Sequence, residues 1–546
     1  MENNFKLLLI QPPVEDFYDT DVRLQPIGLA FLKSAMAKAL PKVQVKIVDF
    51  HHGWGRQTLS IPKELSYLKP YYPVHDKSPF SVFYQYYRFG ASNETMLEHI
   101  LREKPDMIGI SSLFTAYYRE VLSLAEAIKA SYPVPILVGG SHVSAYPSTI
   151  LSHPAVDFIL QGEAENSLPK FIQHIIDGSD FGNCAGLGYK RHGELFINAS
   201  GPGPDLTQLP LPDLSDLAAE KYLYEGKPMC CLVTSRSCPH RCSFCSVHLT
   251  FGTEYRKRSA EAIVAEIAQR YQEGYRVFDF EDDNLTFYKK EMLELLDGIE
   301  AQLPIGELQF VAMNGISYLS LDAELLRRMK NVGFTHLNLS LVTSDKAVRE
   351  STKRPHTVEK YLDIVKLAHS LELKIVSYQI LGLPGETLDS MLQTLAFNSQ
   401  LPVLLGASMY YDAPSISKER KFQSEEDLFK MRLSAIAIES EDVKREDIYS
   451  LFVVTRILNF LKGLNLKSNQ TWSEILEAFR DCPEMVDLRR IDELLKGSPL
   501  RARDPQATLL SKFKPHLLLE VLKRAPAICC QSGFKISGLG SARTEN

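Results

Sequence analysis

Three cysteines are the residues whose spacing most clearly indicates chemistry. Cys238, Cys242 and Cys245 follow one another in a C-x3-C-x2-C pattern, directly after the strand-like apolar run Met229–Thr234. Thiolates are soft ligands suited to iron–sulfur clusters, and a cubane [4Fe–4S] cluster needs one ligand for each iron. Three cysteines on one loop therefore predict a cluster whose fourth iron is open to something other than protein.

Two other interpretations of these thiols stay open at this point. They could be free, or they could bind zinc. A structural zinc ion usually takes four protein ligands, and His240 or His248 could supply the fourth. The spacing favours the cluster, although short motifs do give false matches.

The spacing, with Phe244 directly before the last cysteine, resembles the cluster loop of radical S-adenosylmethionine (SAM) enzymes. The resemblance implies that the open iron binds the amino and carboxylate groups of SAM. An electron from the cluster then cleaves SAM to a 5′-deoxyadenosyl radical. It also implies an external electron donor of the flavodoxin or ferredoxin type.

The composition bounds the class of protein. With 546 residues, 45% hydrophobic and 23% charged, the chain is expected to form about two to four globular domains. A formal charge of −6 argues against a nucleic-acid partner. We find no apolar run long enough for a membrane span and no signal-peptide pattern. Nine clustered cysteines suit a reducing compartment, so we expect a cytoplasmic protein.

The first 183 residues alternate strand-like runs with amphipathic helical stretches, which is typical of an open α/β sheet. Such sheets bind ligands at the carboxyl ends of their strands. The predicted strands are Lys6–Ile10, Val43–Asp49, Met107–Ser111, Ile136–Val138 and Asp157–Leu160, and the predicted helices include Ile27–Ala39 and Tyr117–Ser131.

Four segments of this region, P-P, Q-P-I-G-L-A-F-L, V-P-I-L-V-G-G-S-H-V-S-A-Y-P and V-D-F-I-L-Q-G-E-A-E-N-S-L, resemble the Rossmann-like cobalamin-binding domain that precedes many radical SAM domains. The resemblance implies cobalamin contacts at the strand ends. His142 could alternatively cap its own loop. The candidate contacts are Pro13, Ser111, Gly139, Gly140, His142, Gly162 and Glu163.

One motif of some cobalamin proteins is missing. Their D-x-H-x-x-G loop, which supplies a histidine to cobalt, has no counterpart after the first predicted strand. The segment from Asp49 to Trp54 only half resembles it and follows the second strand. We therefore do not expect His51 to bind cobalt.

The rest of the chain divides into three parts. Residues 184–228 are predicted to be a hairpin and a proline-rich linker, and residues 415–546 a helical region with a flexible tail that carries Cys529 and Cys530. Residues 229–414 alternate strands and helices, and the family resemblance implies an open (β/α)6 TIM-type barrel. Its predicted strands are Cys231–Thr234, Val277–Glu281, Leu308–Val311, His336–Leu341, Lys374–Ile380 and Val403–Met409.

Two loops of this barrel resemble SAM-contacting segments of the family, and a third position departs from it. F-D-F-E-D-D-N supplies Asp282, Asp283 and Asn284, and I-L-G-L-P-G-E-T supplies Glu386. Where the family commonly has a Glu-Ser pair, this chain has Val342 and Thr343, so Ser340 is the candidate substitute.

The two resemblances together predict a cobalamin-dependent radical SAM enzyme. We expect it to methylate an unactivated carbon by way of the 5′-deoxyadenosyl radical and methylcobalamin. The alternatives are a cyclase, ring-contracting or carbon–carbon coupling enzyme without net methyl transfer, and a non-catalytic cobalamin or cluster sensor. The substrate could be a small molecule, a lipid or a peptide. The aromatic-rich insert at 52–92 could line an apolar pocket or form ordinary core.

Overall fold

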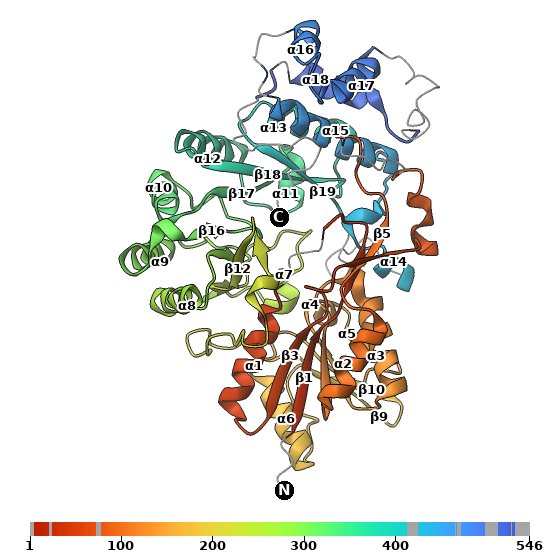
Figure 1. Cartoon of the computed structure of the whole chain (residues 1–546), viewed down its shortest axis with the longest axis vertical. Coiled ribbons are helices and arrows are strands. Elements are labelled where there is room, and N and C mark those ends of the chain that lie inside the picture. The colour runs from red at the N-terminus through yellow and green to blue at the C-terminus, as the bar shows by residue number, and fades with distance from the viewer. Residues whose placement is uncertain are drawn as a thin grey trace.

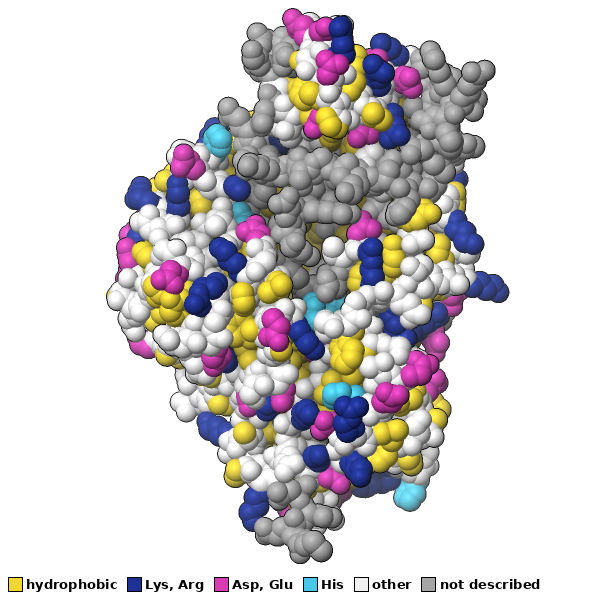
Figure 2. All heavy atoms as spheres, in the orientation of Figure 1, with side chains coloured by type: hydrophobic (Ala, Val, Ile, Leu, Met, Phe, Trp, Pro, Cys, Tyr) yellow, Lys and Arg dark blue, Asp and Glu magenta, His cyan; other side chains and the backbone are white. Residues whose placement is uncertain are grey.

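The computed structural model of the chain describes residues 5–20, 25–72, 78–411, 424–464, 466, 471–496, 511–525 and 527–529. Two sheets separated along the sequence dominate it (Figure 1). On the face drawn in Figure 2, acidic and basic side chains are interspersed. Among the described helices, none is long and apolar enough to cross a membrane.

The N-terminal sheet has seven strands in the order β10-β9-β8-β7-β6-β1-β3. Its central strands are parallel, and residues Leu7 to Ile10 are at most 2% exposed, as expected where helices cover both faces. The hairpin β9–β10, which we predicted to stand before the proline-rich linker, extends this sheet because β9 pairs antiparallel with β8. The strands are β1 Lys6–Gln11, β3 Gln44–Asp49, β6 Met107–Ser111, β7 Ile136–Gly139, β8 Phe158–Leu160, β9 Leu187–Arg191 and β10 Glu194–Ile197.

Two pairs of helices flank this sheet, since α1 packs against α6 and α2 against α3. Local sequence sets their ends. The Ser92 hydroxyl, for example, accepts from the Thr95 amide at the start of α2. The helices are α1 Ile27–Ala39, α2 Asn93–Glu103, α3 Tyr118–Ser131, α4 Ser141–Ala145, α5 Pro147–Leu151 and α6 Ser167–Asp177, with a 3-10 turn η2 at Thr115–Tyr117.

Two strands of the aromatic-rich insert, β4 Arg56–Leu59 and β5 Tyr86–Phe89, form a second, small sheet with β2 Val14–Asp16 in the order β2-β5-β4, and the insert also contains the 3-10 helix η1 Lys63–Leu68. Its rings are core rather than pocket lining. Tyr72 packs edge-on against both Phe17 and Phe83, and all three side chains are buried. The insert also buries Tyr71, Phe80, Tyr86 and Tyr87.

Six parallel strands form the partial barrel that the resemblance implied. They fall into two runs, β12-β15-β16 and β17-β18-β19, which parallel bridges from Phe310 to Phe334 and from Ile316 to Leu339 connect. The fold class is thereby confirmed. The strands are β12 Lys227–Leu232, β15 Val277–Phe280, β16 Gln309–Val311, β17 His336–Val342, β18 Lys374–Leu381 and β19 Leu404–Met409, with β11 Leu223–Tyr224 at one edge.

Helices between the strands cover the outside of this sheet (Figure 1). They are α8 Ala260–Gln272, α9 Lys289–Gln302, α10 Ala323–Val332, α11 Lys346–Ser351, α12 Val358–Ser370 and α13 Leu388–Ser399, with 3-10 turns η3 Ala219–Lys221 and η4 Ile305–Glu307.

The C-terminal region is helical, as predicted. Its long helix α15 packs on β19, where the Asn459 amide exchanges hydrogen bonds with the Leu405 backbone. The predicted boundary at 414 and Cys530 lie outside the described residues. The elements are α14 Glu425–Phe429, η5 Leu433–Ala435, α15 Arg445–Gly463, α16 Trp472–Ala478, α17 Met485–Leu495 and α18 Pro515–Arg524.

Candidate functional site

The cysteine loop follows β12, at the end of the barrel where the carboxyl termini of the strands meet. A short hairpin, β13 Ser235–Arg236 paired with β14 Arg256–Lys257, and the helix α7 Val247–Phe251 enclose the loop. Cys242 is 7% exposed, and Cys238 and Cys245 are half-buried. All three are free thiols. A bond from the Ser243 amide to the Thr352 carbonyl, 3.0 Å long, ties the loop to the end of α11.

Two buried residues beside the candidate site have left-handed backbones. Ser237, directly before Cys238, has φ 76°, and Val342 at the bulge of β17 has φ 71°. Such conformations are unfavourable for residues with a side chain, most of all for a β-branched one. Ser237 is held there by its amide, which donates to Asp283 Oδ2, and by its hydroxyl, which donates to the Gly252 carbonyl. Hydrogen bonds to distant parts of the chain therefore override local preference at the start of the cysteine loop.

The donor arrangement fits a cubane better than zinc. Among the described residues, no three His, Cys, Asp or Glu side chains converge so as to hold a single metal ion. A cubane places each thiolate on a different iron, so its three sulfurs need not meet at one point. His240 packs against Phe287 and His356, so its ring belongs to an aromatic cluster beside the loop. Burial raises the pKa of the Cys245 thiol to about 11.

The three polar residues after β15 differ in burial and in their hydrogen-bond partners. Asp282 is fully buried and accepts bonds from the amides and hydroxyls of Thr234 and Ser235, so its oxygens hold the backbone that leads to the cysteines. Asp283 is less enclosed, and burial raises its pKa to about 6. Asn284 donates from Nδ2 to Cys238 Sγ at 3.5 Å, while its buried Oδ1 has no partner among the described residues.

The candidate residues of the two later barrel loops, Glu386 and Ser340, also make different contacts. Glu386 is 4% exposed, and its Oε2 accepts from the amides of Gly382 and Leu383 at 3.0 and 3.2 Å, which closes the G-L-P-G-E-T loop on itself. Ser340 is half-buried, and the Arg354 guanidinium donates to its carbonyl. The bulge between Ser340 and Val342 gives β17 a different register here, which accompanies the missing Glu-Ser pair.

The candidate cobalamin contacts gather at the carboxyl ends of β1, β6, β7 and β8. Gly140 has φ 119°, and a Cβ there would lie 2.5 Å from the Ser112 carbonyl oxygen, so only glycine fits. The buried hydroxyl of Ser112 has no partner among the described residues. Gly162 donates its amide to Ser144 Oγ at 2.8 Å. Pro13, Ser111 and Gly139 complete the same edge of the sheet.

His142 and His51 are both enclosed. The His142 ring lies between Tyr118 and Tyr146, and its Nδ1 contacts the Thr115 hydroxyl at 3.1 Å. Burial lowers its pKa to about 4, so the ring is neutral at pH 7. His51 contacts the Phe89 carbonyl through Nδ1, and its ring stacks edge-on against His52.

Glu163 is the candidate cobalamin contact that the structure assigns most clearly to another partner. Its carboxylate lies 2.6 Å from Arg236 and also pairs with Arg256, both on the hairpin beside the cysteine loop. The arginines at these positions were not singled out from the sequence, because nothing local distinguishes them from the other Lys and Arg residues. Arg354, whose guanidinium lies beside Cys242, escaped notice for the same reason.

The two candidate cofactor edges face one another. The helix α4, which follows the Gly139–Gly140 turn, packs against α7, which follows the cysteine loop. Gly162 also lies close to this helix, since a Cβ on it would be 3.7 Å from the Thr250 carbonyl oxygen. The sequence placed both edges at strand ends, but only the packing of the two sheets brings them together.

Comparison with protein families matches two domains. Residues 232–397 match the Radical SAM superfamily, and residues 80–172 match the B12 binding domain. A radical SAM domain uses a [4Fe–4S] cluster with SAM, and a B12-binding domain binds cobalamin, so these are the cofactors of this chain.

Relatives with similar sequences include several methyltransferases. An uncharacterized methyltransferase, PH0819 from Pyrococcus horikoshii, is 24% identical over 73% of this chain and 78% of its own length. Cytidylyl-2-hydroxyethylphosphonate methyltransferase from Streptomyces wedmorensis is 24% identical over 76% of this chain and 80% of its own. The anaerobic magnesium-protoporphyrin IX monomethyl ester cyclase of Rubrivivax gelatinosus is 25% identical over 56% of each chain.

Two solved structures share the fold. The radical SAM methyltransferase TsrM from Kitasatospora setae, with cobalamin and a [4Fe–4S] cluster bound, superposes with a TM-score of 0.55 at 15% identity, over 74% of this chain and 72% of that one. OxsB with aqua-cobalamin and SAM bound gives 0.56 at 14% identity, over 100% of this chain and 78% of that one. With its B12-binding domain followed by a radical SAM domain, the chain belongs to the cobalamin-dependent radical SAM enzymes.

Proposed function

We propose that this enzyme is a methyltransferase that acts on an unactivated carbon. The observation that carries the proposal is the packing of α4 against α7, which sets the candidate cobalamin edge beside the cysteine loop. A methyl donor and a radical source must both reach one carbon, so they need a common face. The similarity to several methyltransferases supports the same reaction class.

The chemistry is divided between cofactors and protein. When bound, the cluster with SAM supplies a radical that can break a C–H bond, and cobalamin supplies a transferable methyl group. The chain has to hold both groups, orient them and keep water out. We assign the iron to Cys238, Cys242 and Cys245, and Asn284 to orienting the Cys238 sulfur, to which its amide donates.

Asp283 and Asn284 are the proposed polar contacts for SAM. Asp282 instead fixes the loop backbone, since its oxygens already accept from Thr234 and Ser235. On the other edge, the proposed contacts for cobalamin are the backbone at Gly140 and Gly162 and the hydroxyl of Ser112, which has no partner among the residues that the structure describes. An external flavodoxin- or ferredoxin-type protein is the proposed electron donor.

The test uses SAM itself as the probe, because the methyl donor is common to every substrate. Protein purified without oxygen is reconstituted with iron, sulfide and cobalamin, reduced with dithionite and given SAM with an isotopically labelled methyl group. We expect release of 5′-deoxyadenosine and labelled methyl on the extracted cobalamin. The control is the triple variant Cys238→Ala/Cys242→Ala/Cys245→Ala, which should release none.

The other outcomes separate the alternatives. Release of 5′-deoxyadenosine with no label on cobalamin would contradict methyl transfer and favour a cyclase or coupling enzyme, the class of the relative from Rubrivivax gelatinosus. Binding of both cofactors without SAM cleavage would contradict the enzyme and favour a sensor.

A further inference from the structure

A buried network of four charged side chains connects the two candidate cofactor edges. Arg236 bridges two carboxylates, with Nη1 2.6 Å from Glu163 Oε2 and Nη2 2.6 Å from Glu165 Oε1. Arg256 pairs with Glu163 from the neighbouring strand β14. Two arginines therefore balance two glutamates. Glu163 and Glu165 follow β8 of the N-terminal sheet, and both arginines belong to the hairpin beside the cysteine loop.

Three of the four side chains of this network are buried, and the fourth is mostly buried. The side chains of Arg236, Glu163 and Glu165 are 7%, 4% and 5% exposed, and that of Arg256 is 17% exposed. The Arg236 guanidinium also lies over the Phe31 ring, 5.1 Å from its centroid. The linker backbone passes so close that a Cβ on Gly203 would lie 2.3 Å from both Arg256 and Glu163. Charges buried in this way are strongly held by their partners.

The residues of this network are close in sequence to both candidate cofactor loops. Glu163 directly follows Gly162, whose amide and neighbours form the candidate cobalamin edge. Arg236 precedes Ser237, the strained residue that leads into Cys238. Each side of the ion pair is thus within two residues of a candidate cofactor loop, and a shift of either loop would have to stretch the buried contacts of Arg236 with two carboxylates.

We propose that Arg236 is a positioning residue that sets the spacing and orientation of the cobalamin edge relative to the cluster loop. This inference rests on the proposed function, because it assumes that both cofactors bind at these loops. Glu163, predicted as a cobalamin contact, acts here as the acceptor on the cobalamin side. Arg256 braces that acceptor.

The first test is amide hydrogen exchange of the full-length protein without cofactors. In Arg236→Met and in Glu163→Gln, we expect the segments 160–167 and 234–240 both to exchange about tenfold faster, because a local opening no longer has to break the bridge. The reporting amides are those of Gly162, bonded to Ser144, and of Ser237, bonded to Asp283.

Lys257→Met is the matched control. Lys257 lies next to Arg256 on β14, but its ion pair with Glu291 stays within the barrel and is half-exposed. Both segments should exchange as in the wild type. The proposal would be overturned if only one segment of Arg236→Met exchanged faster, or if both exchanged within twofold of the wild type. Faster exchange throughout the protein would overturn it too. If Arg236→Met does not fold, the shorter and uncharged Arg236→Gln takes its place, and wild-type exchange of both segments in that variant would equally overturn the proposal.

The second test measures the spacing itself. In the loaded protein, pulsed EPR between cobalt(II) in cobalamin and the reduced cluster should give one narrow distance in the wild type and in Lys257→Met, and a broader distribution in Arg236→Met. An unchanged distribution would refute the positioning role. A wild type that takes up neither cofactor would instead refute the proposed function, while the exchange experiment still decides whether the bridge joins the loops.

Discussion

Glu386 is a buried carboxyl group whose pKa is higher than its ordinary value. Burial dominates over two backbone donors and raises its pKa from 4.5 to about 8. The folded chain therefore keeps a proton on Glu386 that the unfolded chain has lost above pH 4.5. Since the folded state binds more protons between pH 4.5 and 8, this group makes the protein less stable as pH rises through that range.

Glu386→Gln should remove this pH dependence while keeping an oxygen that can accept from Gly382 and Leu383. Relative to the wild type, we expect the variant to gain up to about 3 kcal/mol between pH 5.5 and 7.5, at about 1.4 kcal/mol per pH unit. Thermal unfolding midpoints of the cofactor-free protein across that range measure it. The exposed Glu350→Gln is the control and should show a constant difference. Parallel profiles for Glu386→Gln and wild type would mean that the pKa is not raised.

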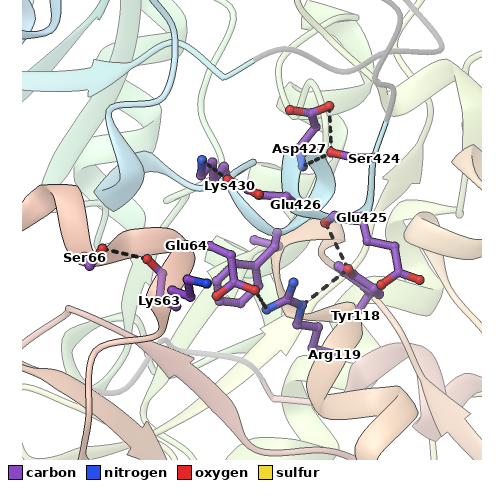
Figure 3. Close-up of polar contacts among 12 residues, drawn as sticks. Lys63, Glu64, Ser66, Tyr118, Arg119, Ser424, Glu425, Glu426, Asp427 and Lys430 are labelled. Carbon is purple, nitrogen blue, oxygen red and sulfur yellow. Dashed lines mark hydrogen bonds and ion pairs between the residues drawn. The ribbon is translucent and has the colours of Figure 1, made fainter.

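At the scale of elements, the C-terminal segment that contains α14 and η5 is anchored to the N-terminal domain. Figure 3 shows Tyr118 and Arg119 of α3 reaching α14 and η1, with the Tyr118 hydroxyl donating to the Glu425 carbonyl and Arg119 contacting Glu64 at 2.8 Å. Next to this contact, the buried Arg432 lies 3.6 Å from Asp16 of β2. Its guanidinium also donates to the carbonyls of Glu15 and Ala116.

Arg432→Met should destabilise the protein by about 3–5 kcal/mol, because it leaves the fully buried Asp16 without its cation. We also expect faster amide exchange in residues 424–436, which the arginine ties down. Arg119→Met is the matched control. It removes a partly exposed pair and a ring contact and should cost about 1 kcal/mol. Thermal unfolding and exchange of the two variants side by side check this, and equal losses would contradict the anchoring role of Arg432.

The whole molecule combines two large sheets, one in each half, over one continuous hydrophobic core. All candidate cobalamin contacts lie at or just after the ends of strands of the seven-stranded sheet, and all three candidate iron ligands follow a barrel strand. The two halves touch through α4 and α7, through the Arg236 bridge, and through Gln25, whose side chain accepts from the Cys231 amide of β12 at 2.7 Å. This arrangement lets each half keep its own binding chemistry.

The triple variant Cys238→Ala/Cys242→Ala/Cys245→Ala should therefore lose iron but keep cobalamin. The cobalt content after reconstitution is expected to stay within about twofold of the wild type, because the N-terminal sheet retains its fold and its strand-end contacts. Metal analysis and the optical spectrum of bound cobalamin measure both. Loss of cobalt together with iron would show that the two sites do not bind independently.

The sequence alone predicted many of the elements and proposed the chemistry of the cysteine loop. Helix Ile27–Ala39 and strand Met107–Ser111 have the predicted bounds, because apolar periodicity and turn residues act over a few neighbours. Thiolate spacing is equally local, which is why the cluster loop could be read before any fold was known.

Only the tertiary structure decided how the polar groups are used. Glu163 and Arg236 are 73 positions apart in the chain, and no local sequence pattern predicts their contact. Asp282 looked like its neighbour Asp283, yet the approach of Thr234 and Ser235 occupies its oxygens. The sequence predicted the hairpin β9–β10 but not its pairing with β8, because the partner of an edge strand depends on which sheet edge lies beside it in the fold. Partners distant in sequence are selected by packing, and packing depends on the whole chain.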